Sequence, residues 1–239
     1  MTAADELHRA LGALWTSVTD SALRELLPRD VASLSDFYPR LQRHVSLHAR
    51  ASAGSVDADA IVRGEIVHLG EGSRIEAGAI IHESCRLVLG PRSVVRAGSL
   101  FRDEVVIGAD CLVGANCEVT RSVLLGPDTA LGHSIVFSDS VAGAGTLLSA
   151  FIGTANTHLM KGREISIRTS AGRVATARSY LGALLGEDVR IGPNTTISPG
   201  TIVMPGLRIP PGSALLGIID ATRQQSLMAD FYLRAGIGE

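Results

Sequence analysis

The sequence predicts an all-β solenoid, a left-handed parallel β-helix of six-residue repeats, with an N-terminal helical extension and a C-terminal helix. Large apolar residues recur at every sixth position over long stretches of the chain. A period of six fits neither an α-helix nor an alternating strand, but it fits a coil with three short faces of six residues each. The longest series is Leu89, Val95, Phe101, Ile107, Val113, Val119, Leu125, Leu131 and Phe137.

Two shorter series extend this repeat, one from Leu69 to Leu87 and one from Leu185 to Leu215. The residue four places after each large one is usually small or β-branched. Gly, Asn or Asp often stands at the corners, where the backbone turns sharply. All three cysteines fall on the small inward positions, so we expect buried free thiols. They are Cys85, Cys111 and Cys117.

Both ends of the chain carry helical signals instead. Thr2 and Asp5 can form a capping box, and helical spacing of apolar residues follows. Further helical stretches cover roughly residues 20–27 and 31–48, the second broken near Pro39. We expect a last helix with Asp220 as its cap, Leu227 and Phe231 facing inward, and Gly236 after its end. The helices are expected to cap the solenoid and to make subunit contacts.

The chain therefore divides into a helical extension over residues 1–50, a solenoid over 51–219 and a C-terminal helix over 220–239. The six-residue period disappears over 155–180, which predicts an inserted loop. This loop holds Lys161, the single lysine among 22 basic residues. Loops of this length in a regular fold usually carry function.

Composition excludes several classes of function. The chain has 239 residues with 22 basic and 24 acidic side chains, a net charge of −2, so it has no broad basic surface for nucleic acid. No apolar run is long enough to span a membrane, and the first residues do not resemble a signal peptide. Three cysteines favour reduced thiols and a cytoplasmic protein.

Residues from about Leu69 to Gly217 resemble a known family. The motifs are Glu118-Val-Thr-Arg-Ser-Val-Leu-Leu-Gly, Leu131-Gly-His133, Ala155-Asn156, Tyr180-Leu-Gly-Ala-Leu-Leu-Gly and Ser198-Pro-Gly. They are similar to the acetyltransferase domain of bifunctional glucosamine-1-phosphate acetyltransferase/uridylyltransferases, above all the archaeal type. The uridylyltransferase half of that family has no counterpart in this sequence.

The resemblance implies a homotrimer whose acetyl-CoA cleft lies between neighbouring subunits. It implies that His133, Asn156 and Glu118 are catalytic, that Arg96, Arg121 and Lys161 bind the acceptor, and that Ala150 and Ala183 contact acetyl-CoA. Two tyrosines that surround the sugar in the family are replaced by Val136 and Thr157, and the Gly-Ala-Gly around the thioester alanine is Ser-Ala-Phe. The identity of the acceptor is therefore open.

The residues themselves fit acyl transfer to an amine. The reaction needs a positioned neutral amine, a group that takes its proton and donors for the oxyanion. An imidazole suits the proton step because its ordinary pKa of about 6.5 lies near working pH. His133 stands two places after the inward Leu131, so it should emerge at a corner. We predict an acyl-CoA-dependent N-acyltransferase for a small amine such as an amino sugar or its phosphate, with acetyl-CoA as donor.

Two other classes of protein remain open. Metal catalysis would need clustered ligands, but the coil histidines form no close pair, and His44 and His48 on the helical flank have no third ligand evident in the sequence. We therefore expect no metal in the chemistry. A non-catalytic repeat subunit, like the regulatory subunits related to sugar-nucleotide pyrophosphorylases, would share the same solenoid. Free CoA should stabilise an acyltransferase and leave such a scaffold unchanged.

Overall fold

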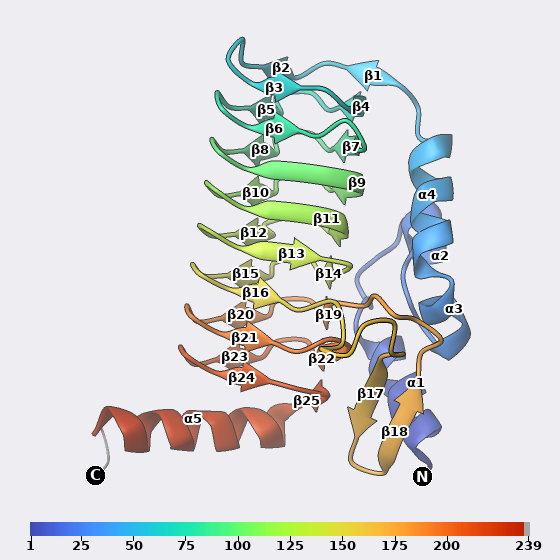
Figure 1. The fold of residues 1–239 in the computed structure, drawn as a ribbon, viewed down its shortest axis with the longest axis vertical. Coiled ribbons are helices and arrows are strands. Elements are labelled where there is room, and N and C mark those ends of the chain that lie inside the picture. The colour runs from blue at the N-terminus through green and yellow to red at the C-terminus, as the bar shows by residue number, and fades with distance from the viewer. Residues whose placement is uncertain (237–239) are drawn as a thin grey trace.

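The computed structural model describes residues 1–236, so residues 237–239 of the expected C-terminal segment lie outside the described residues. The centre of the molecule is a parallel β-solenoid in which short strands stack coil upon coil (Figure 1). Each coil contributes to three faces, which we number one, two and three. The long strands β9 (Leu100–Ile107) and β11 (Glu118–Leu124) bend from face one onto face two.

Besides these two long strands, each face is a stack of parallel strands. Face one holds β3 (Ile61–Val62), β6 (Ile80–Ile81), β13 (Val136–Ser138), β16 (Gly153–Thr154), β21 (Thr196–Ile197) and β24 (Ala214–Leu215). Face two holds β1 (Ala51–Ser52), β4 (Glu65–Leu69), β7 (Arg86–Leu89), β14 (Val141–Ala142), β19 (Ala183–Leu185), β22 (Thr201–Val203) and β25 (Ile218–Ile219). Face three holds β2 (Ser55–Val56), β5 (Arg74–Ile75), β8 (Val94–Val95), β10 (Leu112–Val113), β12 (Ala130–Leu131), β15 (Leu147–Leu148), β20 (Arg190–Ile191) and β23 (Arg208–Ile209).

The apolar residues of the repeat fill the axis of the solenoid, as the sequence predicts. On face three, Val95 pairs with Val113, and Val113 pairs with Leu131 in the next coil. Each of these side chains is fully buried in one continuous core, together with the three cysteines. Burial of large apolar side chains in register is what holds such coils together.

One residue of the longest series departs from the expected register. The pairing of β11 with β9 shifts by one residue at the corner formed by Arg121. As a result Leu124 pairs with Ile107 and faces the axis, whereas Leu125 belongs to a second apolar cluster outside the solenoid. Leu125 is still only 3% exposed, because helices cover it.

Four N-terminal helices lie along face two instead of capping an end of the solenoid, which corrects that expectation (Figure 1). The expected contacts of these helices with another subunit stay a prediction. They are α1 (Ala3–Ala13), α2 (Ser21–Leu26), α3 (Val31–Ser35) and α4 (Phe37–Leu47). Their apolar side chains meet the outward-facing Val88, Val123 and Leu184 of face two in a second core. From β4 to β22, face two is therefore buried on both sides within one chain.

Local signals explain where these helices begin. Thr2 and Asp5 form the capping box that the sequence predicts. The stretch expected to break near Pro39 breaks earlier, at Asp36, and Pro39 lies in the first turn of α4. Proline is tolerated there because first-turn amides have no partner within the helix.

The C-terminal helix α5 (Ala221–Ala235) crosses the end of the solenoid as a cap (Figure 1). Asp220 accepts a hydrogen bond from the Arg223 amide, and Gly236 ends the helix in the left-handed region with φ 66°. Leu227 packs on the core of the solenoid, while Phe231 is half-buried. No helix among residues 1–236 is long and apolar enough to cross a membrane.

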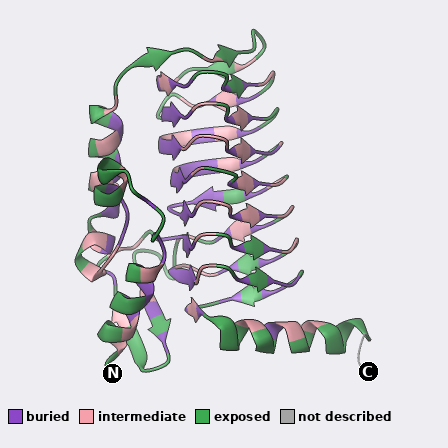
Figure 2. Cartoon of the chain, turned by 180° about the vertical axis from the view of Figure 1, so that it is seen from behind, coloured by how far each residue is buried: buried purple, intermediate pink, exposed green. Residues whose placement is uncertain are grey.

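The inserted loop leaves the solenoid after β16 and returns at β19, at the corner between faces one and two. It contains an antiparallel hairpin of β17 (Ser166–Thr169) and β18 (Gly172–Ala175). Ile165 and Ile167 bury the hairpin against the solenoid. Figure 2 shows exposed loops along the corner opposite the helices, between faces three and one.

Candidate functional site

The first candidate region is the corner between faces three and one, where His133 lies. Gly132 and His133 turn the chain from β12 to β13, and the imidazole is exposed. Its Nδ1 accepts a long hydrogen bond of 3.3 Å from the Ala115 amide in the preceding coil. The Ala115 amide therefore engages the Nδ1 lone pair only weakly.

The same corner brings Ala150 beside His133. Because Leu131 pairs with Leu148, Ala150 occupies the position of His133 in the next coil. The following residue, Phe151, is 62% exposed with φ 59°, and its amide donates to the His133 carbonyl oxygen over 3.0 Å. A large exposed aromatic side chain in left-handed backbone is an unusual corner residue.

Two of the other expected site residues lie toward the N-terminal coils. Arg96 stands at the same corner two coils before His133, half exposed, with Glu76 at 4.0 Å as its carboxylate neighbour. Glu118 lies on the outer surface of face one and pairs with Arg102 at 3.0 Å. Its charge is therefore balanced by a neighbouring strand.

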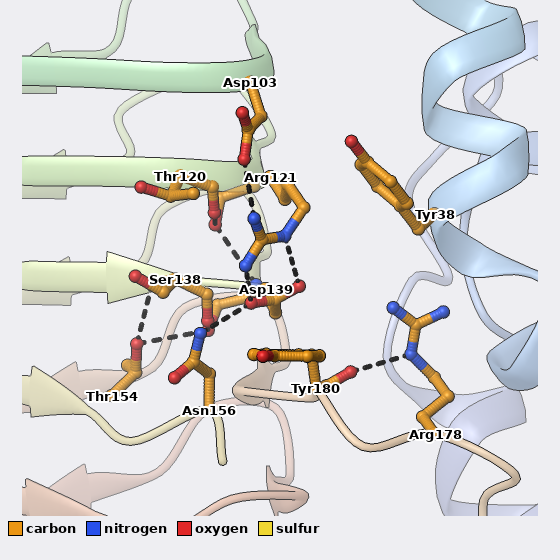
Figure 3. A network of polar contacts seen from close by, with 12 residues as sticks. Tyr38, Asp103, Thr120, Arg121, Ser138, Asp139, Thr154, Asn156, Arg178 and Tyr180 are labelled. Carbon is orange, nitrogen blue, oxygen red and sulfur yellow. Dashed lines mark hydrogen bonds and ion pairs between the residues drawn. The ribbon is translucent and has the colours of Figure 1, made fainter. Parts of the chain in front are cut away.

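The second candidate region is the corner between faces one and two. Asp103, Arg121 and Asp139 occupy this corner in three successive coils, each with a positive φ between 45° and 54° (Figure 3). Arg121 donates to both carboxylate oxygens of Asp139 over 2.8 Å and to Asp103 over 2.6 Å. The Asp139 side chain is only 2% exposed. Its hydrogen bonds raise the pKa of the guanidinium.

Two tyrosines from distant parts of the chain flank Arg121. The rings of Tyr38 and Tyr180 lie with their centroids 5.8 and 5.6 Å from the guanidinium carbon. Such contacts between a cation and an aromatic face are attractive. The Tyr38 hydroxyl donates to Glu104 over 2.9 Å, and burial raises its pKa to about 12. Arg178 Nε donates a hydrogen bond to the Tyr180 carbonyl oxygen over 2.8 Å.

Asn156 belongs to this second corner. Its Nδ2 donates to Asp139 over 2.7 Å, at the point where the inserted loop leaves face one (Figure 3). Beside it, Thr154 Oγ1 accepts from the Ser138 amide over 2.9 Å. The buried Thr120 hydroxyl, 7% exposed as a residue, has no hydrogen-bond partner among residues 1–236. Together these groups form a small, mostly buried polar cluster at the edge of face one.

The two corners do not meet within one chain. His133 lies at one edge of face one and Asn156 at the other, separated by a stretch of about six residues, or roughly 15–20 Å. Lys161 lies on the exposed part of the inserted loop, between exposed Met160 and Gly162. Ala183 faces the interior, where its amide donates to Ser140 Oγ.

Four residues of the second corner are not among the expected site residues. They are Tyr38, Asp103, Asp139 and Tyr180. The two aspartates carry a readable signal, since each lies 18 residues from Arg121 and hence one coil away. The tyrosines carry none, because the covering helices and the inserted loop bring them in.

Neither the thiols nor the histidines form a reactive cluster. Burial raises the pKa of Cys111 to about 12 and also raises that of Cys85 and Cys117, which disfavours a nucleophilic thiolate. His48 lies with its ring 4.9 Å from that of His68 and 5.7 Å from that of His44. Within residues 1–236, no group of three or more His, Cys, Asp or Glu side chains could hold a metal ion.

One family model matches the chain. Its description is hexapeptide repeat of succinyl-transferase, and it covers residues 104–132, ending just before His133. No curated protein sequence matches the chain significantly.

Several solved structures match the chain over most of its length. The polysialic acid O-acetyltransferase OatWY is 14% identical over 72% of this chain and 82% of its own, with a TM-score of 0.42. A mutant perosamine N-acetyltransferase from Caulobacter crescentus, in complex with CoA and GDP-perosamine, is 18% identical over 75% of this chain and 61% of its own (TM-score 0.28). A mutant of AntD, an N-acyltransferase from Bacillus cereus in complex with dTDP and CoA, is 12% identical over 81% and 96% (TM-score 0.29).

Proposed function

We propose that the protein transfers an acyl group from acyl-CoA, with acetyl-CoA as the expected donor, to the amine of a small acceptor such as an amino sugar. The observation that carries the proposal is the exposed imidazole of His133 at a solenoid corner, with Ala150 in the adjacent coil. The matched repeat of succinyl-transferase, which ends at Gly132, supports the same class of reaction.

In the proposed reaction the neutral amine attacks the thioester carbonyl carbon. The N–C bond forms, the C–S bond breaks, and His133 takes a proton from the amine nitrogen and passes it to the departing CoA sulfur. The Nδ1 lone pair that accepts the 3.3 Å bond from Ala115 is available for this step, because so long a hydrogen bond is weak. The backbone beside Ala150 is the proposed place of the thioester.

The residues at the other edge of face one take part only if a second copy supplies them. Asn156 lies too far from His133 of its own chain for both to touch one acyl group. We therefore place the reaction between subunits of a homotrimer, with His133 from one chain and Asn156 from the next. Asn156 would orient the acceptor with the polar atoms that its bond to Asp139 leaves free.

Of the charged residues, Arg96, Lys161 and Glu118 act on the acceptor in this proposal, and Arg121 has a structural role. Arg96 is half exposed, and its ion pair with Glu76 is long at 4.0 Å, so its guanidinium can also hold a phosphate or carboxylate of the acceptor. Lys161 is exposed on the inserted loop and can reach a neighbouring subunit. Arg121 already binds two carboxylates, so we assign it to ordering the corner instead of binding the acceptor. Glu118, paired with Arg102, would orient the amine after release of that partner.

A thiol-release screen tests the proposal. Purified protein is incubated with acetyl-CoA and a panel of amino sugars, their phosphates and nucleotide-linked amino sugars, and free CoA is measured. We expect release above the hydrolysis background with at least one class of amine, and a higher Tm in the presence of CoA. A protein that neither gains stability from CoA nor releases thiol would be a non-catalytic subunit.

A further inference from the structure

The hairpin of the inserted loop places two like charges face to face. In the antiparallel pairing of β17 with β18, Arg168 lies directly opposite Arg173. Like charges directly opposite on neighbouring strands destabilise the pairing. A hairpin built for stability alone would place an acid or a neutral residue at one of these positions.

The two arginines line a cavity together with a third. The cavity has a volume of about 200 Å³, and Arg163, Arg168, Arg173 and His158 form its polar wall. Pro199 and Leu216 of the solenoid form its apolar wall. Three exposed arginines therefore line one small space at the edge of the solenoid.

Two carboxylates lie near this cluster, Glu164 in the cavity wall and Glu6, which accepts hydrogen bonds from Ser170 and Ala171 at the tip of the hairpin. Glu164, the acid in the cavity wall, accepts a hydrogen bond from the Ala177 amide. Within the described part of the chain, none of the three arginines forms an ion pair. Solenoid arginines, by contrast, pair along the coils, as Arg92 does with Asp110 at 2.6 Å. Three arginines against one carboxylate in the cavity wall leave a net positive charge that an anionic ligand can balance.

Buried side chains and close backbone contacts fix the hairpin against the solenoid. Ile165 and Ile167 are buried, and they pack so closely that a Cβ at Gly200 would lie 3.0 and 3.2 Å from them. A Cβ at Gly217, whose φ is 79°, would lie 2.6 Å from the Arg168 carbonyl oxygen. The backbone that carries Arg168 therefore rests directly on the solenoid.

We propose that this cavity binds the pyrophosphate of a nucleotide. Guanidinium groups match phosphate oxygens with paired hydrogen bonds, and three of them can balance a dianionic pyrophosphate. The cavity is too small for a whole nucleotide, for which pockets of about 300–1,000 Å³ are usual. Resting on the proposed function, the pyrophosphate would belong either to acyl-CoA or to a nucleotide-linked acceptor.

Thermal unfolding with inorganic pyrophosphate tests the cavity without any catalysis. At matched ionic strength, pyrophosphate should raise the Tm of the wild type, and the double variant Arg168→Gln/Arg173→Gln should lose this increase. Arg24→Gln, which removes an exposed charge on α2, should retain it. A wild type that gains nothing, or a double variant that gains as much as the wild type, would overturn the proposal.

The same variants report on the repulsion itself. Without ligand, the double variant should unfold at the same temperature as the wild type or higher, because a like-charge contact is removed. If it instead unfolds at a lower temperature, the arginines stabilise the hairpin, and the argument for a ligand fails.

Kinetics then identify the source of the pyrophosphate. If acyl-CoA supplies it, the double variant should raise the KM for acetyl-CoA about tenfold, since hydrogen bonds to charged groups contribute strongly, and CoA should raise the wild-type Tm more than UDP does. If the acceptor supplies it, the KM for the acceptor rises instead. If the double variant leaves both KM values unchanged, the cavity does not bind pyrophosphate during turnover, and the proposed function still stands. If the double variant loses the stabilisation by pyrophosphate but the wild type releases no thiol, the pyrophosphate site stands and the proposed function fails.

Discussion

The buried thiols make the stability of the fold depend on pH. Cys111 lies inside the solenoid, where burial raises its pKa to about 12, against about 8.5 for a thiol in an unfolded chain. Below pH 8.5 the thiol is neutral in both states, so its contribution to stability is complete. As the pH rises from there toward 12, only the unfolded chain gains a thiolate, and stability is lost.

We expect Cys111→Ala to make the free energy of unfolding less dependent on pH between about 9 and 11. One titrating group contributes at most about 1.4 kcal/mol per pH unit, and chemical denaturation at several pH values measures the slope. Val113→Ala, a nearby core substitution without a thiol, should lower stability equally at every pH. An unchanged slope in Cys111→Ala would mean that the thiol is accessible to water.

The repeat predicts some single residues better than others. It places His133 at a corner, and the structure exposes the imidazole there. The same count places Asp139 at a corner, yet Asp139 is buried, because the inserted loop and the helices close over it. The six-residue period fixes where a side chain leaves the coil. It does not tell which distant segment will cover it.

At the scale of elements, the ladder of Asp103, Arg121 and Asp139 ties three coils together at the corner under the helices. Removing Asp139 leaves the Arg121 guanidinium without its bidentate partner in a place where water has little access. We expect Asp139→Ala to lower the free energy of unfolding by about 3 kcal/mol, as breakage of a buried ion pair does. Denaturant unfolding measures the change.

Asp110→Ala is the matched control for that substitution. Asp110 also binds an arginine of another coil through both carboxylate oxygens, but at an exposed corner. Exposed pairs contribute little, so this variant should be close to wild type. Equal losses in the two variants would contradict a special role of the covered corner.

The covering of face two has a signal in the sequence, although the expectation was that the helices lie at the ends of the solenoid. Leu87-Val88-Leu89 and Val105-Val106-Ile107 are continuous apolar runs, and the middle residue of each faces the helices. A strand with one face in water alternates, whereas a strand buried on both faces does not. Which element covers such a strand is not encoded locally, since the helices lie tens of residues away.

At the scale of the whole molecule, the helices cover face two and leave faces one and three open. Val136 on face one is 46% exposed, and Phe151 at the adjoining corner is more so. Exposed apolar faces favour association between copies of a chain, and most such assemblies are closed by cyclic symmetry. We expect light scattering to give a trimer of about 75 kDa, three times 25.0 kDa.

The interface is tested by Val136→Asp, which would bury an unpaired carboxylate between subunits. The variant should dissociate into monomers, while Leu47→Asp, at an exposed position of α4, should keep the trimer. A wild-type monomer would exclude a site shared between chains. A Val136→Asp trimer would exclude face one as the interface.

Steady-state kinetics of thiol release with a saturating amine test whether His133 is the general base. His133→Ala should lower kcat by roughly 10²–10⁴-fold, the usual effect of losing a general base. Its affinity for CoA should barely change, since the imidazole is proposed to exchange a proton with the amine and the sulfur and not to hold the pantetheine arm or the nucleotide. His8→Ala, which removes an exposed histidine of α1, should keep wild-type turnover. Wild-type turnover in His133→Ala would contradict the mechanism and leave His133 as a solvated corner residue.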